Sequence, residues 1–204
     1  MRAALIGYSG HSFVIIDTLL SLSYNIEGYC EQQEKENNPF GIRYLGSEQD
    51  ARTLEQLKNI DVFLGLGDNK LRSKIYLHLI ENGINCPSIK HIKAIVSPTV
   101  SIGKATVIMP GAIINAMAKI GQAVICNTSS VIEHECVIGN YTHIAPGAVL
   151  AGNVKVGDGS FIGANAVIKQ GVTIGSNVTI GAGAVVIKDI EDGLTFFGNP
   201  AKKG

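Results

Sequence analysis

The sequence repeats with a period of six residues, beginning at Val96 and ending with the unit that starts at Val186. The first residue of each unit is Ile, Leu or Val, with Cys126 as the single exception. The fifth residue is Ser, Thr, Ala or Val in all but two of the sixteen units. A six-residue period matches neither the turn of an α-helix nor the two-residue alternation of a long strand. Each unit therefore predicts a short extended step with one large and one small side chain pointing inward, followed by a corner.

The corners fall at the fourth residue of each unit. In the eight units from Gly147 to Asp189 this residue is Gly, Asn or Asp, the types that adopt positive φ at least cost. Three such units close one coil, and coils stack as parallel strands about 4.8 Å apart. The repeat therefore predicts a parallel β-helix prism in which residues one coil apart, that is three units apart, lie over one another. The alternative is a doubly wound or sandwich fold with chance matches, which sixteen consecutive units without an insertion disfavour.

Residues 1–90 lack the repeat and have the pattern of alternating strands and helices. Apolar runs at 2–6, 26–31 and 61–66 predict strands, and apolar residues at helical spacing in 12–23 and 70–82 predict helices. We expect two domains: a small Rossmann-like parallel α/β domain at 1–90, and the β-helix with a C-terminal tail at 91–204. Ligands of open α/β sheets bind at the carboxyl ends of the strands, where the glycine turn at 7–11 enters a helix. A turn that only serves packing would explain the same glycines.

The charge and the cysteine pattern argue against several classes of protein. Lys plus Arg and Asp plus Glu both number 17, so the chain lacks the cationic excess typical of nucleic-acid-binding proteins. No apolar run approaches the length of a membrane span, and the first residues do not have the pattern of a signal peptide. Cys30, Cys86, Cys126 and Cys136 form no CxxC pair, which favours reduced thiols and a cytoplasmic protein.

His134 is the most informative of the five histidines. It is third in its unit, beside the corner and facing outward, and Glu135 takes the corner position. A neighbouring carboxylate can orient an imidazole and stabilise its protonated form, which suits a general base. The alternative is an idle histidine on a solvated wall. His143 lies half a coil further on, so a site that uses both histidines requires a second copy of the chain, as in a three-fold ring.

Four segments give the sequence a resemblance to a known family. They are residues 7–11, residues 69–72, the run from Asn127 to Gly139 and the ending at 198–202. Together with the repeat, they resemble the left-handed β-helix hexapeptide acyltransferases, and among these the PglD and sialic acid acetyltransferase type of sugar acetyltransferase. The resemblance spans nearly the whole chain. It implies a Rossmann-like domain, a left-handed parallel β-helix, and a homotrimer with active sites between its subunits.

The resemblance also implies roles for individual residues. It makes His134 the general base and Glu135 the residue that raises its basicity. It places acetyl-CoA between neighbouring prisms, in contact with His143, Gly152, Ala164 and Ala182. It places a nucleotide-linked amino sugar in the first domain, at Ser9, Gly10, His11, Glu31, Gln32 and Gly67. Glu31 and Gln32 stand where the family commonly has two aspartates.

The repeat supports part of this assignment independently. Gly152 follows His134 by one coil and Ala182 follows Ala164 by one coil, so these outward-facing third positions are expected to stack in two columns. Small side chains at three of the four would let the pantetheine chain of CoA approach the backbone.

We therefore expect an acetyl-CoA-dependent N-acetyltransferase that acts by direct transfer on the amine of a nucleotide-linked amino sugar, as in the synthesis of bacterial glycan precursors. His134, Glu135 and His143 lack the ligand spacing of known metal sites, so no metal is expected. One alternative is O-acetylation of a sugar hydroxyl, as on a sialic acid. Another is a non-catalytic β-helix protein that binds nucleotide sugars. The sequence does not identify the nucleotide, the stereochemistry of the sugar or the position of the amine.

Overall fold

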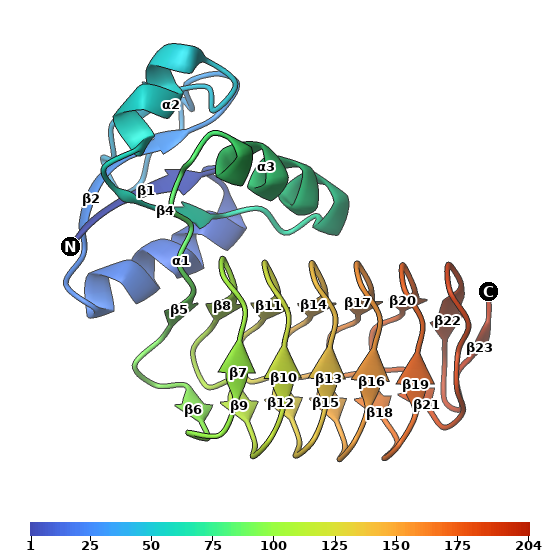
Figure 1. Ribbon diagram of the computed structural model, residues 1–204. Helices are drawn as coiled ribbons and strands as arrows, with labels where there is room; N and C mark the ends of the chain where they lie inside the picture. Colours follow the sequence, from blue (N-terminus) through green and yellow to red (C-terminus); the bar gives the residue numbers. More distant parts are fainter.

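The computed structural model describes all 204 residues and divides into a globular domain and an elongated prism (Figure 1). The domain lies over the end of the prism at which its first strands begin, and the prism extends away from it toward the C-terminus (Figure 1). None of the three helices has the length and apolar character of a bilayer-spanning segment.

The N-terminal domain is a four-stranded parallel sheet in the order β3–β2–β1–β4, with three helices. The strands are β1 (Arg2–Ile6), β2 (Asn25–Cys30), β3 (Tyr44–Gly46) and β4 (Asp61–Leu64), and the helices are α1 (Gly10–Ser21), α2 (Ala51–Leu57) and α3 (Asn69–Glu81). The parallel α/β domain is confirmed, and the ends of the three expected strands and two expected helices differ from the prediction by at most two residues.

Two elements of this domain were not predicted. Strand β3 has only three residues and helix α2 only seven, too few for a hydrophobic period to be recognised. Together they extend the sheet beyond β2 and place Glu48 and Gln49 near its carboxyl edge, next to the end of β2.

The prism consists of three sheets, and from β5 to β22 successive strands of the chain pass from one sheet to the next. The five-stranded sheet contains β7 (Ser101–Ile102), β10 (Lys119–Ile120), β13 (Val137–Ile138), β16 (Lys155–Val156) and β19 (Thr173–Ile174). The six-stranded sheet contains β6 (Ile95–Val96), β9 (Ile113–Ile114), β12 (Val131–Ile132), β15 (Val149–Leu150), β18 (Val167–Ile168) and β21 (Val185–Val186). The eight-stranded sheet contains β5 (Ile89–Lys90), β8 (Val107–Ile108), β11 (Ile125–Cys126), β14 (His143–Ile144), β17 (Phe161–Ile162), β20 (Thr179–Ile180), β22 (Thr195–Phe197) and β23 (Lys202–Lys203).

The predicted coil of three units is confirmed by the strand register. Lys119 pairs with Val137 and Val137 pairs with Lys155, each one coil further on, and the pairing is parallel throughout except between β22 and β23. The division at residues 90 and 91 stays a prediction, and β5 already pairs with β8 in the eight-stranded sheet.

The corners adopt the backbone conformation that the repeat predicts. Every fourth position from Ala105 to Gly183 has a positive φ, between 50° and 75°. The expectation is wrong at Asp189, whose φ lies outside this region. The Oδ1 atom of Asp189 instead accepts the main-chain N–H of Thr173 at 2.8 Å, and only an isolated bridge between Ile174 and Ile190 continues the ladder there.

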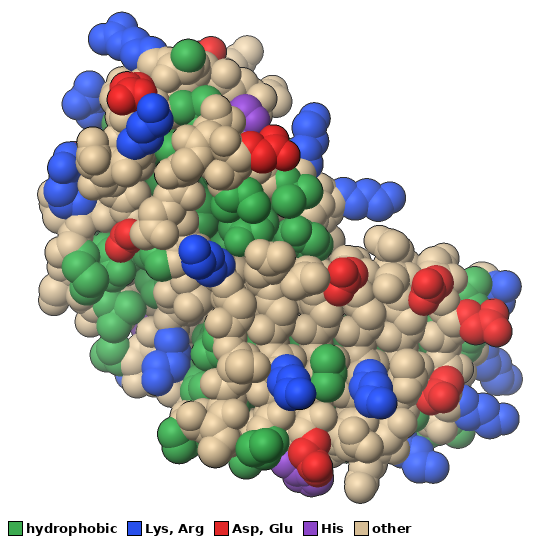
Figure 2. All heavy atoms as spheres, in the orientation of Figure 1, with side chains coloured by type: hydrophobic (Ala, Val, Ile, Leu, Met, Phe, Trp, Pro, Cys, Tyr) green, Lys and Arg blue, Asp and Glu red, His purple; other side chains and the backbone are tan.

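The interior of the prism is one apolar cluster of 25 buried residues. Two other clusters join the prism wall to the N-terminal domain, one with Ala105 and Ala123 beside Ile75, the other with Val107 and Ile125 beside residues of β1 and α1. This apolar packing fixes the domain on the wall. On the face seen in Figure 2, hydrophobic side chains gather around the N-terminal domain, whereas the prism wall carries scattered Lys, Arg, Asp and Glu side chains.

Candidate active site

The prism has three edges, which we name by what they carry. The His134 edge joins the six-stranded to the five-stranded sheet and contains the corner at residues 134 and 135, between β12 and β13. The alanine edge joins the eight-stranded to the six-stranded sheet and contains Ala164 and Ala182. The α3 edge joins the five-stranded to the eight-stranded sheet and lies against the N-terminus of α3.

His134 and Glu135 form a pair on an exposed corner. The Nδ1 atom of His134 lies 3.1 Å from Oε2 of Glu135, and the two side chains are 52% and 65% exposed. A carboxylate can only accept a hydrogen bond, so Nδ1 carries the hydrogen and Nε2 keeps a free lone pair. Glu135 holds a φ of 62°, which is unfavourable for a residue with a side chain. The pair has the geometry of a general base and its orienting carboxylate.

Gly152 lies directly beside the ring of His134. A Cβ built at Gly152 would stand 2.5 Å from Cε1 and 2.6 Å from Nε2 of the imidazole. The main-chain N–H of the next residue, Asn153, donates to the carbonyl of His134 at 2.9 Å, so the two corners stack as the repeat predicts. The absence of a side chain at Gly152 therefore sets the position of Nε2, the atom that would accept a proton.

Ala164 and Ala182 stack on a different edge. The N–H of Gly183 donates to the carbonyl of Ala164 at 2.8 Å, which places the two corners one above the other. Ala164 is half-buried and Ala182 is exposed. Within one chain, these two residues and the His134 pair lie on separate edges of the prism.

His143 does not share the exposed surface of His134. It begins β14 in the eight-stranded sheet, one coil after Ile125, in a column of outward-facing residues that the N-terminal domain covers, and it is only 8% exposed. Its Nδ1 lies 3.3 Å from the carbonyl of Gly67 and its Nε2 lies 3.0 Å from Nδ2 of Asn127. The Oδ1 atom of Asn127 accepts the N–H of Thr128, so Nδ2 donates to Nε2, and the hydrogen of His143 is on Nδ1.

The second histidine at this junction is His11, whose ring centroid lies 6.0 Å from that of His143. Burial lowers the pKa of His143 to about 3, with Arg72 and His11 adding to the effect. Burial also lowers the pKa of His11 to about 4, again with a contribution from Arg72. Both rings are therefore neutral at physiological pH, and Nε2 of His11 is buried without a hydrogen-bond partner.

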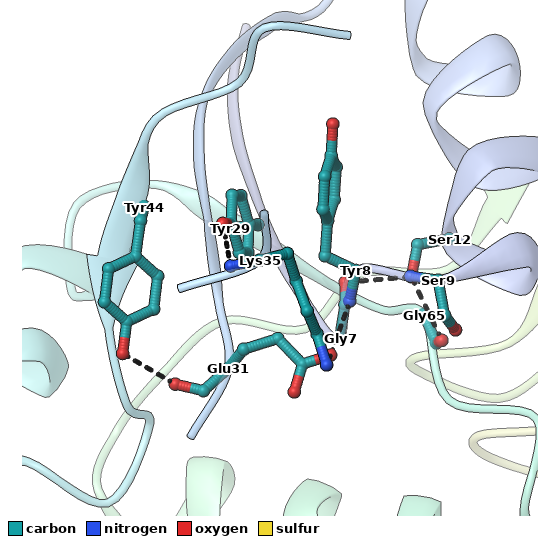
Figure 3. A network of polar contacts seen from close by, with 9 residues as sticks. All are labelled: Gly7, Tyr8, Ser9, Ser12, Tyr29, Glu31, Lys35, Tyr44 and Gly65. Carbon is teal, nitrogen blue, oxygen red and sulfur yellow. Dashed lines mark hydrogen bonds and ion pairs between the residues drawn. The ribbon is translucent and has the colours of Figure 1, made fainter. Parts of the chain in front are cut away.

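A cavity of about 310 Å³ lies at the carboxyl ends of β1, β2 and β4, as the sheet topology predicts. Glu31 and Gln32 line it together with Glu48 and Lys74. The carboxylate of Glu31 accepts the N–H of Tyr8 in the glycine turn at 2.9 Å and pairs with Nζ of Lys35 at 3.4 Å (Figure 3). Glu31 thus stabilises the glycine turn through this hydrogen bond and also lines the cavity.

The other residues expected to bind the sugar lie around the start of α1 and α3. Ser9 and Gly10 are exposed at the N-terminus of α1, where the N–H of Ser9 donates to Oγ of Ser12 at 3.3 Å (Figure 3). The carbonyl of Gly67 faces the prism, where it accepts from His143. Among the expected site residues, the structure therefore brings together His11, Gly67 and His143 at the domain junction, and His134, Glu135 and Gly152 on the His134 edge.

The comparisons with known proteins match both halves of this arrangement. Residues 2–79 match the family model of the PglD N-terminal domain, and residues 153–188 match that of the bacterial transferase hexapeptide (six repeats). The acetyltransferase domain of PglB from Neisseria gonorrhoeae FA1090, solved in complex with acetyl coenzyme A, is 34% identical with a TM-score of 0.93. The match covers 100% of this chain and 98% of that one. The chain belongs to the PglD-like sugar acetyltransferases.

Two further solved structures match the whole chain. PerB from Caulobacter crescentus, solved in complex with CoA and GDP-perosamine, is 32% identical with a TM-score of 0.92, over 100% of this chain and 97% of that one. WeeI from Acinetobacter baumannii AYE is 25% identical with a TM-score of 0.86, over 100% of both chains. The resemblance seen in the sequence is confirmed, and with it the left-handed β-helix after a Rossmann-like domain.

Sequence reasoning missed several residues around the candidate site. Glu48, Gln49 and Lys74 line the cavity, but the first two follow the unpredicted strand β3 and the third lies in the middle of a helix without a motif. Asn69 and Arg72 lie in a segment that carried the family resemblance, and that segment was the signal that could have marked them. No group of three or more His, Cys, Asp and Glu side chains is arranged to hold a metal ion.

Proposed function

We propose that this chain transfers the acetyl group of acetyl-CoA to the amine of a nucleotide-linked amino sugar. The N. gonorrhoeae relative was solved with acetyl coenzyme A, and the C. crescentus relative with CoA and GDP-perosamine. Two further structures of the C. crescentus GDP-perosamine N-acetyltransferase carry a histidine replaced by Asn or Ala, both in complex with CoA and GDP-perosamine. These relatives support acetyl-CoA as co-substrate and a sugar amine as acceptor.

The observation that carries the proposal is the His134–Glu135 pair beside Gly152. The neutral amine of the sugar attacks the thioester carbonyl carbon and forms the C–N bond while Nε2 of His134 accepts a proton from the nitrogen. Glu135, on the other ring nitrogen, stabilises the imidazolium that results. The tetrahedral intermediate then loses the C–S bond, and the imidazolium returns the proton to the departing CoA thiolate.

Gly152 supplies a candidate oxyanion donor. Its main-chain N–H makes no hydrogen bond within the chain, as is also true of other third positions such as Ala164 and Ala182, but among these it is the one beside His134. A free, fixed N–H beside the base can stabilise the negative charge that develops on the thioester oxygen. Gly152 would then both leave room for the imidazole of His134 and donate a hydrogen bond to the oxyanion.

The proposed active assembly is a homotrimer with each site shared by two copies. His134, Glu135 and Gly152 lie on one edge of the prism, whereas Ala164 and Ala182 lie on another, so one chain does not bring all the proposed contacts together. A three-fold ring sets the His134 edge of one prism beside a different edge of its neighbour. Both ring nitrogens of His143 have partners, so its proposed contact with acetyl-CoA would use ring carbons.

The nucleotide is proposed to bind in the N-terminal domain, with Glu31, Gln32 and Glu48 in the cavity at the strand ends and Ser9, Gly10, His11 and Gly67 around the adjoining helix starts. Carboxylates there can accept hydrogen bonds from ribose, base or sugar groups, and the amide of Gln32 can both accept and donate them. We place the reaction in the cytoplasm, which the four buried free thiols support.

The test is release of CoA thiol from acetyl-CoA with a panel of UDP-, GDP- and dTDP-linked amino sugars, each beside its hydroxyl analogue. Turnover on amines supports the proposal. Turnover on hydroxyls alone would replace it with O-acetylation. Tight binding of a nucleotide sugar with no turnover on the whole panel would leave a non-catalytic binding protein.

A further inference from the structure

Three corner residues of the α3 edge form a column of hydrogen-bond acceptors. Ala123, Tyr141 and Gly159 follow one another at intervals of one coil, and all have positive φ, at 50°, 59° and 68°. They belong to three successive coils of the prism. Their carbonyl oxygens face the first turn of α3, the helix of the N-terminal domain that lies against this edge (Figure 1).

Two side chains of α3 contact the whole column. Asn69 donates from Nδ2 to the carbonyls of Gly159, at 2.9 Å, and Ser160, at 3.1 Å. Arg72 donates from Nε to the carbonyl of Ala123 at 2.8 Å and from Nη2 to that of Tyr141 at 2.8 Å. The two side chains also contact each other, because Oδ1 of Asn69 accepts from Nη2 of Arg72 at 2.7 Å. One helical turn thus spans three coils.

Arg72 is a buried cation without a carboxylate partner. It is 1% exposed, and its remaining nitrogen, Nη1, donates to the carbonyls of Leu66 at 3.0 Å and Gly67 at 3.1 Å. Burying a charge without an opposite charge is costly, so the carbonyl oxygens around it have to replace its hydration. Only the fork of an arginine reaches all these acceptors at once, because a lysine offers a single nitrogen.

The same helix lines the proposed sugar cavity. Leu71, Lys74 and Ile75 of α3 contribute to the cavity wall, and so does Leu66, whose carbonyl Arg72 binds. The side chains of Asn69 and Arg72 face the prism from between these residues. The position of the cavity relative to the prism therefore depends on how firmly the first turn of α3 is held.

We infer that Asn69 and Arg72 form a clamp that fixes the sugar-binding cavity relative to the prism, and that both are positioning residues for acetyl transfer. The clamp itself is independent of the proposed function, whereas its consequence for transfer rests on it. Neither residue touches the reacting atoms. A loosened clamp would leave each ligand able to bind its own part of the chain but misalign the amine and the thioester, which costs rate more than affinity.

The first experiment measures the clamp without any substrate. Hydrogen–deuterium exchange of the full chain would compare the wild type with Arg72→Met, Arg72→Lys and Asn69→Ala. Ser73→Ala is the matched control, since the hydroxyl of Ser73 bonds only to Lys70 within the same turn. We expect amides of residues 61–81 to exchange about tenfold faster in the three clamp variants, with residues 131–180 of the prism unchanged. Exchange within twofold of the wild type at 61–81 would overturn the clamp.

The second experiment measures the consequence for transfer. We expect kcat to fall about tenfold or more in Asn69→Ala and Arg72→Lys, while the Kd values of CoA and of UDP, GDP or dTDP, whichever the wild type binds, stay within about threefold. Arg72→Lys should not rescue kcat although it keeps the charge. Full turnover by Arg72→Lys would overturn the positioning role. If the wild type turned over no sugar, the proposed function would fail, and the exchange experiment would still decide on the clamp.

Discussion

Replacing Gly152 by Ala tests whether the absence of a side chain there positions the imidazole of His134, the proposed base. The added Cβ would stand 2.5 Å from Cε1 of His134, whereas ordinary contacts begin at 3.4 Å, so the ring has to retreat by the difference, 0.9 Å. Displacing a reacting group by about 1 Å can cost about 10²-fold in rate. We therefore expect kcat to fall about 10²-fold in Gly152→Ala.

The same substitution should leave the fold almost unchanged. The φ of Gly152 is not in the positive region, so alanine fits the backbone there without strain. The atoms that the new methyl group meets belong to the end of an exposed side chain, which can move aside. The temperature of unfolding, measured by calorimetry, should stay within a few degrees of the wild type. A large loss of stability would contradict this reading of the corner.

The assay is thiol release under saturating acetyl-CoA and acceptor sugar, and a double-mutant cycle provides the control. A methyl group at residue 152 could also obstruct acetyl-CoA, which would raise its KM and act without His134. In a His134→Ala background, the effect of Gly152→Ala on kcat should disappear if it acts through the ring. A loss of similar size in both backgrounds, or wild-type turnover in the single variant, would refute the seating role.

Three further predictions concern the base, the cavity and the domain junction. His134→Ala should lower kcat about 10²- to 10⁴-fold without a change in the circular dichroism spectrum, and wild-type turnover would refute its role as base. Glu48→Gln should raise the KM of the nucleotide sugar about tenfold and leave that of acetyl-CoA unchanged. Glu48 is 6% exposed and lines the cavity, and its carboxylate accepts a hydrogen bond only from Gln49. An unchanged KM for the sugar would contradict this. Burial lowers the pKa of His143 to about 3 and that of His11 to about 4, below the usual value of about 6.5. Between these values the unfolded chain binds protons that the folded chain does not, so the free energy of unfolding should fall as the pH drops from about 6.5 to 4. His143→Gln should reduce the difference in melting temperature between pH 7 and pH 4.5, and an unchanged difference would count against this linkage.

The prism could be predicted because its geometry follows from a local sequence pattern. In the later coils the corners carry Gly or Asn, which tolerate positive φ, and throughout the prism each side has one large and one small inward side chain, so the period alone gives the coil of three units. Stacking then follows, and with it the adjacency of Gly152 to His134. Glu135 is one of six corner residues with positive φ that are neither Gly nor Asn, with Ala105, Met117, Ala123, Ser129 and Tyr141, so its place beside His134 is what marks it as a candidate site.

The surroundings of His143 could not be predicted in this way. The repeat places it outward like His134, but it does not tell which stretch of wall the N-terminal domain covers. Val107 and Ile125, two coils and one coil before it in the same column, are apolar and buried under that domain. An outward column of apolar residues was thus a signal that the wall is covered there, and His143 lies where this cover ends.

The three edges of the prism carry different groups, so the proposed base and the proposed acetyl-CoA contacts do not meet within a single chain. The α3 edge is bound by Asn69 and Arg72, which would give the proposed acceptor cavity one fixed position relative to its own prism. The His134 edge carries the proposed base, and the alanine edge carries Ala164 and Ala182, whose small side chains would let a pantetheine chain approach the backbone. Since the corners of a triangular prism point apart, the base and the small residues can meet at one groove only if they come from different copies. If the proposed trimer is the active form, specific activity should fall on dilution in parallel with its dissociation. A fully active monomer would show that the base and the acetyl-CoA contacts have been assigned to the wrong edges.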